Sequence, residues 1–343
     1  MEKGDKMKQI TLGKTGLCAT RLGFGGIPIQ RVSENQAIKT VRHAVKCGVD
    51  FIDTARAYTT SEKRIGLALK NLNKKVIVAS KSTNRKPADL RQDLETSLAN
   101  LQRDYIDLYQ CHYVKNEEDY QQIISPSGAL EVLIKAKAEG LIGHIGITSH
   151  SLDLVDRILD DNIFETVMIC FSFLEPAARE KIIPKAIKKN VGLIAMKSFS
   201  GGVLDNPRLA LKYVLSHPQI LVIPGVESKK KFDENWSVFQ GNWKLEDAEK
   251  SEIEDIRLRY TKNFCRRCDY CQPCSEDISI QMILGLRYSV RRFGDGFLKN
   301  NWVKENIEKA RQCSACEECM PRCPYDLPIP DLIQKNIEWL DEG

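Results

Sequence analysis

Short apolar runs alternate with amphipathic stretches from about residue 20 to residue 240 of this 343-residue chain. Eight runs rich in β-branched and aromatic residues predict strands: Arg21–Ile27, Phe51–Asp53, Val76–Ser80, Ile106–His112, Gly143–Thr148, Thr166–Phe171, Gly192–Lys197 and Ile220–Pro224. The stretches between them carry apolar residues at helical spacing, and the first begins with a Ser33 N-cap followed by Gln36 three residues later. This strict alternation predicts a parallel sheet covered by helices.

Eight such units are the expected count for a (β/α)8 TIM barrel, an α/β fold. A doubly wound open sheet is the alternative. Its G-x-G-x-x-G fingerprint is absent, because Gly23, Gly25 and Gly26 follow the first strand at a different spacing. The segment Lys8–Leu17 predicts a hairpin that closes the bottom of the barrel.

Behind the barrel pattern, eight of the twelve cysteines fall into two runs. The first contains Cys265, Cys268, Cys271 and Cys274, and the second contains Cys313, Cys316, Cys319 and Cys323. The second run has the C-x2-C-x2-C-x3-C-P form of bacterial ferredoxins, in which thiolates hold iron–sulfur clusters. Zinc is the rival metal, but its sites usually pair two C-x2-C units about a dozen or more residues apart. The spacing therefore favours iron–sulfur.

The residues between the two runs show helical patterning. We therefore expect two domains, a barrel over residues 1–260 and an α-helical iron–sulfur domain over residues 261–343.

The bulk composition changes this picture little. A net charge of +5 is spread along the chain, and the basic runs Lys229–Lys231 and Arg291–Arg292 predict solvated faces rather than a nucleic-acid site. The N-terminus has no signal-peptide h-region, and no apolar stretch is long enough to span a membrane. Cysteines at ligand spacing favour a reducing cytoplasm. The isolated cysteines are predicted to be small buried hydrophobes: Cys18, Cys47, Cys111 and Cys170.

Polar side chains gather where three successive strands end. Asp53 ends the second strand and Tyr58 follows it, Lys81 ends the third, and His112 ends the fourth. In a TIM barrel the catalytic groups lie at the carboxyl ends of the strands. An ammonium beside a phenol favours the phenolate, and such a tyrosine can exchange a proton with a substrate oxygen. The four residues predict carbonyl reduction or alcohol oxidation with hydride from a cofactor.

The motif Asp53-Thr-Ala-x-x-Tyr58, followed by Ser61-Glu62-x-x-Ile-Gly66, Lys81 and His112, resembles the aldo-keto reductase family. The resemblance covers about residues 8–240. It implies that Tyr58 is the general acid/base, that Lys81 and Asp53 tune it, and that His112 orients the carbonyl. It also implies a small-molecule carbonyl or alcohol substrate and NADPH or NADH bound across the barrel mouth without a Rossmann fold.

The positions that the resemblance assigns to the cofactor match less uniformly. Thr148-Ser149 replaces the usual Ser-Asn pair, and Met168 and Phe171 stand where the family usually has Gln and a stacking Tyr. After the last strand, Gly225 lies where the family usually has a Lys-Ser pair. NADP is favoured because of the basic residues after the last strand, and NAD remains open. The expected contacts are Gly25, Gly26, Thr148, Ser149, Met168, Phe171, Met196, Lys197, Gly225, Lys231, Glu234 and Asn235.

The tail resembles the α-helical dicluster ferredoxin module of some dehydrogenase subunits. That resemblance implies two cross-ligated [4Fe–4S] clusters, one held by Cys265, Cys268, Cys271 and Cys323, the other by Cys313, Cys316, Cys319 and Cys274. Ser275 follows Cys274 where proline is usual, so a single cluster at the second run is the alternative.

Together these patterns predict a cytoplasmic NAD(P)H-dependent oxidoreductase, resembling the iron–sulfur branch of the aldo-keto reductases. Two alternatives stay open. The chain could be an electron-transfer protein whose barrel is a docking or substrate platform for a redox partner protein. It could also be a barrel with a vestigial tetrad, given Met168 and Gly225. No nucleic acid or membrane is expected as a partner.

Overall fold

The computed structural model describes residues 8–342, which divide into two units. The first contains the described residues up to Ser200 together with Leu204–Leu245. The second contains Gly201–Val203 and the chain from Glu246 onward.

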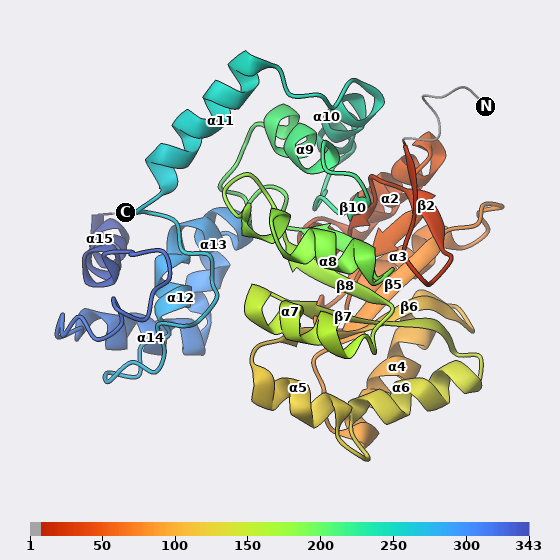
Figure 1. The fold of residues 1–343 in the computed structure, drawn as a ribbon, viewed down its shortest axis with the longest axis horizontal. Helices are drawn as coiled ribbons and strands as arrows, with labels where there is room; N and C mark the ends of the chain where they lie inside the picture. Colours follow the sequence, from red (N-terminus) through yellow and green to blue (C-terminus); the bar gives the residue numbers. More distant parts are fainter. Residues whose placement is uncertain (1–7, 343) are drawn as a thin grey trace. The chain divides into compact units, whose positions relative to one another are not determined.

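Eight parallel strands form the centre of the first unit (Figure 1). They are β3 (Phe24–Gly25), β4 (Phe51–Asp53), β5 (Ile77–Ser82), β6 (Ile106–Val114), β7 (Ile142–Ser149), β8 (Thr166–Cys170), β9 (Gly192–Met196) and β10 (Ile220–Val222). Each strand pairs with its neighbour in chain order. The prediction of eight strands is confirmed, and most boundaries differ by one or two residues.

The two edge strands of this sheet also meet each other. Isolated parallel bridges join Leu22 to Val222 and Gly25 to Gly225, so the sheet closes into a barrel. The first strand is much shorter than predicted. A 3-10 helix, η1 (Ile27–Arg31), begins directly after Gly26, and its Pro28 has no N–H to give to a sheet.

Helices follow the strands and surround the sheet (Figure 1). They are α2 (Glu34–Cys47), α3 (Ser61–Leu69), α4 (Pro87–Leu101), α5 (Glu117–Ile124), α6 (Ala129–Ala138), α7 (Leu152–Asp161), η2 (Ala177–Arg179), α8 (Ile182–Lys188), α9 (Pro207–Leu215) and α10 (Lys229–Gln240). The predicted cap of the first helix is present, because the Ser33 side chain accepts a hydrogen bond from the Gln36 N–H. Gly48 ends that helix at a φ of +130°, a conformation that favours glycine.

A two-stranded hairpin, β1 (Gln9–Thr11) and β2 (Cys18–Thr20), precedes the barrel. Ile10, Leu12 and Ala19 pack into the same buried cluster as Phe51 and Ile77, which begin their strands. The hairpin therefore lies at the amino ends of the strands, where the sequence placed it.

Among its described residues the second unit contains helices and no strand, and both cysteine runs lie in loops between helices. Its elements are α11 (Asp247–Tyr260), α12 (Ile280–Leu284), α13 (Leu286–Phe293), η3 (Asp295–Lys299), α14 (Asn301–Arg311) and α15 (Ile329–Glu342). Its core contains Ile283, Leu286 and Ile333 together with Cys271 and Cys323. Helix α11 groups with this unit, so the division lies near residue 245 and differs by one helix from the boundary drawn from sequence.

The isolated cysteines differ from one another. Cys111 and Cys170 are buried as predicted, but Cys18 is exposed and Cys47 is half-buried. The prediction was wrong for these two, because Cys18 lies on the hairpin and Cys47 on the last turn of α2 beside the polar side chain of His43.

Among residues 8–342, no helix combines the length and apolarity needed to cross a membrane.

Candidate functional site

The four predicted catalytic residues meet at the carboxyl ends of three adjacent strands. Asp53 is the last residue of β4, Lys81 lies near the end of β5, and His112 lies near the end of β6. Tyr58 lies in the loop between β4 and α3. Because side chains alternate along a strand, Lys81 and His112 share the inward face with Ala79 and Leu108 of the barrel core.

Asp53 and Lys81 form a buried ion pair. The Lys81 Nζ donates to both carboxylate oxygens of Asp53, at 2.6 and 2.7 Å, and to the Thr54 carbonyl oxygen at 2.8 Å. The side chains are 2% and 4% exposed. Burial acts to lower the pKa of Lys81, but the charges of Asp53 and Tyr58 more than offset it and raise that pKa. Burial raises the pKa of Asp53 while the Lys81 ammonium opposes the rise. Lys81 is therefore protonated at neutral pH.

Tyr58 and His112 complete the group above this pair. The Lys81 Nζ lies 5.1 Å from the centre of the Tyr58 ring, and the rings of Tyr58 and His112 meet edge to face at 5.7 Å. Tyr58 is half-buried, and its side chain helps to raise the pKa of Lys81. Burial, with help from Lys81 and Arg85, lowers the pKa of His112 to about 3. The imidazole is neutral at physiological pH.

Two groups that hold this site were missed from sequence. The Arg85 Nη2 donates to the His112 carbonyl oxygen at 2.8 Å, and the Arg85 Nε donates to Asp119 at 2.6 Å. The Gln110 amide favours the ionised form of Asp53. Gln110 could have been found, because it lies two residues before His112 and so shares its inward face. Arg85 had no such signal, since its partners follow a different strand.

A buried carboxylate anchors the loop that carries Tyr58. Glu62 is 1% exposed and accepts hydrogen bonds from Ser80 at 2.6 Å and from Arg56 and Asn100 at 3.1 Å. Ser61 donates to the Gly26 carbonyl oxygen at 2.9 Å. Both ends of the short loop from Thr54 to Ser61 are thus fixed, which limits where Tyr58 can point.

The predicted nicotinamide contacts separate into two sets. Met168 and Met196 face the barrel interior. Phe171 is fully buried and packs against Tyr213 of α9 and against His217, so it lies in the layer between sheet and helix and not with the tetrad. Strand parity explains this, because Phe171 is an odd number of residues from the inward Met168.

The hydroxyls of Thr148 and Ser149 are already engaged. Thr148 accepts from the Tyr113 N–H at 2.7 Å, and Ser149 donates to the Val114 carbonyl oxygen at 2.7 Å. Lys197, just after β9, contacts the His150 Nδ1 at 3.4 Å. At the seam, where the first and last barrel strands β3 and β10 meet, a backbone bridge joins Gly25 to Gly225, and Gly26 is buried beside them.

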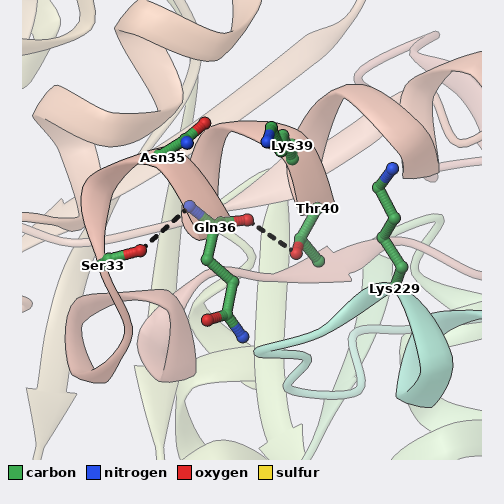
Figure 2. Close-up of a pocket in the computed structure, with 6 residues that line it drawn as sticks. All are labelled: Ser33, Asn35, Gln36, Lys39, Thr40 and Lys229. Carbon is green, nitrogen blue, oxygen red and sulfur yellow. Dashed lines mark hydrogen bonds between the residues drawn. The ribbon is translucent and has the colours of Figure 1, made fainter.

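The residues expected on the adenine side lie on α10. Lys231 is exposed and pairs with Glu227, Glu234 is exposed, and Asn235 is buried. A pocket of about 330 Å³ lies at the start of this helix, beside the start of α2 (Figure 2). Two lysines reach it, and its lining is Ser33, Asn35, Gln36, Lys39, Thr40 and Lys229.

The two cysteine runs have left-handed residues at the same two offsets from their first cysteine. In the first run the residues two and four positions after Cys265, Arg267 and Asp269, have φ values of +60° and +70°. In the second run the residues two and four positions after Cys313, Ala315 and Glu317, have φ values of +52° and +62°. Alternation of left- and right-handed residues turns successive N–H groups toward one side, as in anion and iron–sulfur sites.

The eight thiols fall into two groups of four. Electrostatic interactions link Cys265 with Cys268, Cys271 and Cys323. A second set links Cys319 with Cys316, Cys313 and Cys274. The fourth cysteine of each run thus interacts with the other run. Burial raises the pKa of Cys265 to about 11 and that of Cys271 to about 12, so these thiols would lose their protons on binding a metal.

Comparison with known proteins matches both parts of the chain. Residues 21–208 match the profile described as aldo/keto reductase family, and residues 264–328 match the profile described as 4Fe-4S dicluster domain. The chain is 33% identical over 218 residues to L-galactose dehydrogenase of Arabidopsis thaliana, covering 58% of this chain and 67% of that protein. It is 28% identical over 208 residues to an NADH-specific methylglyoxal reductase of Escherichia coli (strain K12), covering 52% and 63%.

Solved structures agree on the fold. An aldo-keto reductase from Bacillus halodurans in its holo form superposes with a TM-score of 0.62 at 24% identity, covering 73% of this chain and 96% of that one.

Proposed function

Because the chain belongs to the aldo/keto reductase family and is an oxidoreductase of that type, we propose that it catalyses reversible hydride transfer between NAD(P)H and a small-molecule carbonyl, with Tyr58 as general acid and base. The observation that carries this proposal is the Asp53–Lys81 ion pair, which lies beneath a half-buried Tyr58 and beside a neutral His112.

Each side chain has one task in this mechanism. The Lys81 ammonium favours the phenolate form of Tyr58, and Asp53 keeps that ammonium charged and in place. A neutral His112 has one N–H, which can donate to the substrate oxygen. During reduction Tyr58 gives its proton to the oxygen as the carbonyl becomes an alcohol, and during oxidation it takes the proton back. The nicotinamide, when bound, supplies or accepts the hydride.

Replacing Tyr58 by Phe tests this assignment. We expect Tyr58→Phe to lose about 100-fold or more in kcat, because positioned proton transfer typically contributes that much, while the dissociation constant for the cofactor stays within about twofold. Tyr105→Phe is the matched control, since Tyr105 precedes the start of β6 at the opposite end of the barrel. Unchanged turnover in Tyr58→Phe, or an equal loss in the control, would sink the assignment.

We infer NADP as the preferred cofactor from the pocket in Figure 2. Lys39 of α2 and Lys229 of α10 bring two ammonium groups to a pocket of about 330 Å³ near the predicted adenine-side residues. A phosphate on the adenosine ribose suits two such charges. NAD is the alternative, and the relative named as NADH-specific keeps it open.

Lys229→Ala separates these two cofactors. For NADPH we expect KM to rise about tenfold, which corresponds to the loss of one charge-assisted contact, and for NADH we expect no change. Lys230→Ala is the matched control, because Lys230 is the next residue of the same helix and does not line the pocket. Equal effects on both cofactors, or none, would contradict the NADP proposal.

We further propose that the second unit holds two [4Fe–4S] clusters. The thiol sets fit the group, since each contains four thiols and both loops have left-handed residues at the same two offsets. One set is Cys265, Cys268, Cys271 and Cys323, and the other is Cys274, Cys313, Cys316 and Cys319. Bound clusters would supply single-electron transfer.

Iron and sulfide quantitation after anaerobic purification tests the cluster count. About eight iron atoms per chain are expected for two clusters and about four for one. Cys274→Ser should lower the iron content if the fourth cysteine of the first run is a ligand, whereas Cys18→Ser should not. About four iron atoms in the wild-type protein, unchanged in Cys274→Ser, would favour the single-cluster alternative.

Electron transfer is the second candidate function, and the observation that favours it is the presence of two cysteine loops with left-handed residues at matching offsets. In that case the barrel would be a docking or substrate platform for a redox partner. A spectral titration of the oxidised protein with NADPH and NADH, with and without a redox dye, separates the possibilities. Clusters that no electron donor reduces would mean a structural tail.

A further inference from the structure

Three possible metal ligands from two helices converge on the outside of the barrel. His43 and Cys47 lie one turn apart on α2, and Asp233 lies on α10. The His43 Nε2 lies 2.6 Å from the Asp233 Oδ1 and 3.8 Å from the Cys47 Sγ. The three ligand atoms all lie within 4.8 Å of one another. Neither helix face was singled out from sequence, because Asp233 is nearly two hundred residues away along the chain.

The geometry argues against a nucleophilic cysteine. In a Cys–His–Asp triad the two partners of the histidine use different ring nitrogens. Here the thiol and the carboxylate both face the same nitrogen of His43. Three donor atoms that point to one place are better explained by a shared ion.

We propose that His43, Cys47 and Asp233 form a zinc-binding site. Imidazole nitrogen, thiolate sulfur and carboxylate oxygen are the usual ligands of zinc, which takes them in a tetrahedral arrangement. With bond lengths of about 2.0–2.3 Å, such ligands lie about 3.3–3.6 Å apart. The sulfur–nitrogen distance is close to this value, and the nitrogen–oxygen distance must open by less than about 1 Å. A water can take the fourth position, since His43 is 28% and Asp233 57% exposed.

A metal in this place would join the two ends of the barrel. Helix α2 follows the first barrel strand, β3, and helix α10 follows the last, β10. In the described structure these two strands meet through the isolated bridges Leu22–Val222 and Gly25–Gly225, which close the barrel. The helices already touch here, because the Phe232 ring packs edge to face on His43 and Trp236 lies against Gly48. A bound ion would add a link between α2 and α10 at this contact.

One neighbouring cation works against the ion. The Lys74 Nζ donates to the carbonyl oxygen of Val45, two residues before Cys47, at 2.6 Å. A positive charge there repels a divalent cation. Lys74→Ala should therefore bind zinc more tightly than the wild-type protein.

Equilibrium dialysis of the full chain against zinc tests the site. The protein is purified anaerobically with its iron, dialysed against a chelator, and then against micromolar zinc, with zinc and iron measured together. We expect about one zinc per chain with no loss of iron. Cys47→Ser and Asp233→Asn should bind at least about tenfold more weakly, because even groups that only support a ligand cost 10–100-fold. Cys18→Ser, which removes the exposed cysteine of the hairpin, should bind as the wild type does.

Cobalt gives a second readout that does not depend on stoichiometry. Cobalt bound to a thiolate adds a charge-transfer absorption, which should appear in the wild-type difference spectrum and be missing in Cys47→Ser. Zinc should also raise the thermal midpoint of the wild-type barrel but not that of Cys47→Ser. Absent zinc uptake, uptake matched by iron loss, or equal uptake by Cys47→Ser would overturn the proposal.

Discussion

The buried pair under Tyr58 allows a quantitative test of how the site is held. In Asp53→Asn the Lys81 ammonium keeps the Thr54 carbonyl oxygen but loses its counter-charge, although it remains 2% exposed. In Lys81→Met the Asp53 carboxylate is left without its cation. In the double variant Asp53→Asn/Lys81→Met neither charge remains. The three variants form a double-mutant cycle that isolates the interaction between the two side chains.

The burial of both partners sets the magnitude. Breaking a buried ion pair from one side typically costs about 3–5 kcal/mol, because the remaining charge is left without compensation. We expect each single variant to lose this much. We expect the double variant to lose less than the sum, since a neutral pair leaves no isolated charge. For a unit of this size, 1 kcal/mol shifts the thermal midpoint by about 2–4 °C, so each single variant should melt about 6–20 °C lower.

Urea and thermal unfolding followed by circular dichroism at pH 7 measure these changes. The pKa of Lys81 is raised in the folded state, so its contribution is fully present at pH 7 and is lost only as pH rises through that value. Glu95→Gln is the matched control, because Glu95 pairs with Arg91 on the surface, where the two side chains are 58% and 36% exposed. Such exposed pairs contribute about 0–1 kcal/mol.

Two outcomes would refute this reasoning. If Asp53→Asn lowers the free energy of unfolding by no more than the surface control does, the buried Lys81 ammonium does not need Asp53 to compensate its charge. If the single costs add in the double variant, the two side chains do not act on each other in the folded protein.

Three further predictions concern the groups around the site and the barrel. Because the pKa of His112 is lowered to about 3, the imidazole stays neutral above that pH, and kcat/KM from pH 5 to 8 should contain no ionisation that His112→Gln removes. Arg85→Met removes one of the charges that lower this pKa and frees the His112 carbonyl, so kcat should fall more than KM rises and the acidic limb of the pH profile should move upward. Burial acts to raise the pKa of Glu165, but hydrogen bonds from His144 and Lys137 outweigh it and lower that pKa to about 2. Glu165→Gln should therefore lose about 2 kcal/mol of unfolding free energy at pH 7, and the difference from the wild type should vanish as pH falls from about 4 to 2. Unfolding of the wild type and of Glu165→Gln across that pH range checks the last prediction. A stability difference that stays constant with pH would contradict it.

The fold was readable because it depends on a repeating pattern. Strand–helix alternation requires only local information, and the barrel rule then placed Lys81 and His112 together at the carboxyl ends of their strands. Period-two parity, applied to the sixth predicted strand, would have placed Phe171 outside once Met168 was taken as inward. The prediction of a cofactor contact at Phe171 followed a resemblance at a single position and not the parity of the strand.

Contacts between distant segments could not be read in this way. Arg85 and Asp119 meet beyond the ends of two strands, and His43 and Asp233 meet across the seam where the first and last helices come together. Each contact depends on the closure of the barrel and on the reach of long side chains. Neither property leaves a periodic trace in the sequence, so charged pairs of this kind are found only when the chain is folded.

For the cysteine runs, the sequence spacing indicates the type of cluster, whereas the backbone turns bear on the number of clusters. From sequence, two clusters were predicted, and Ser275 in place of a proline kept a single cluster open as the alternative. A cluster ligand, however, is positioned by the turn that carries it and not by the residue that follows the run. Both runs turn at the same two offsets, at Arg267 and Asp269 and again at Ala315 and Glu317. Because left-handed φ values at non-glycine residues are uncommon, a repeated pair of them at equal spacing from the first cysteine is difficult to explain by chance. The backbone therefore favours two equivalent cluster loops, and the iron content of Cys274→Ser decides whether the first loop is filled.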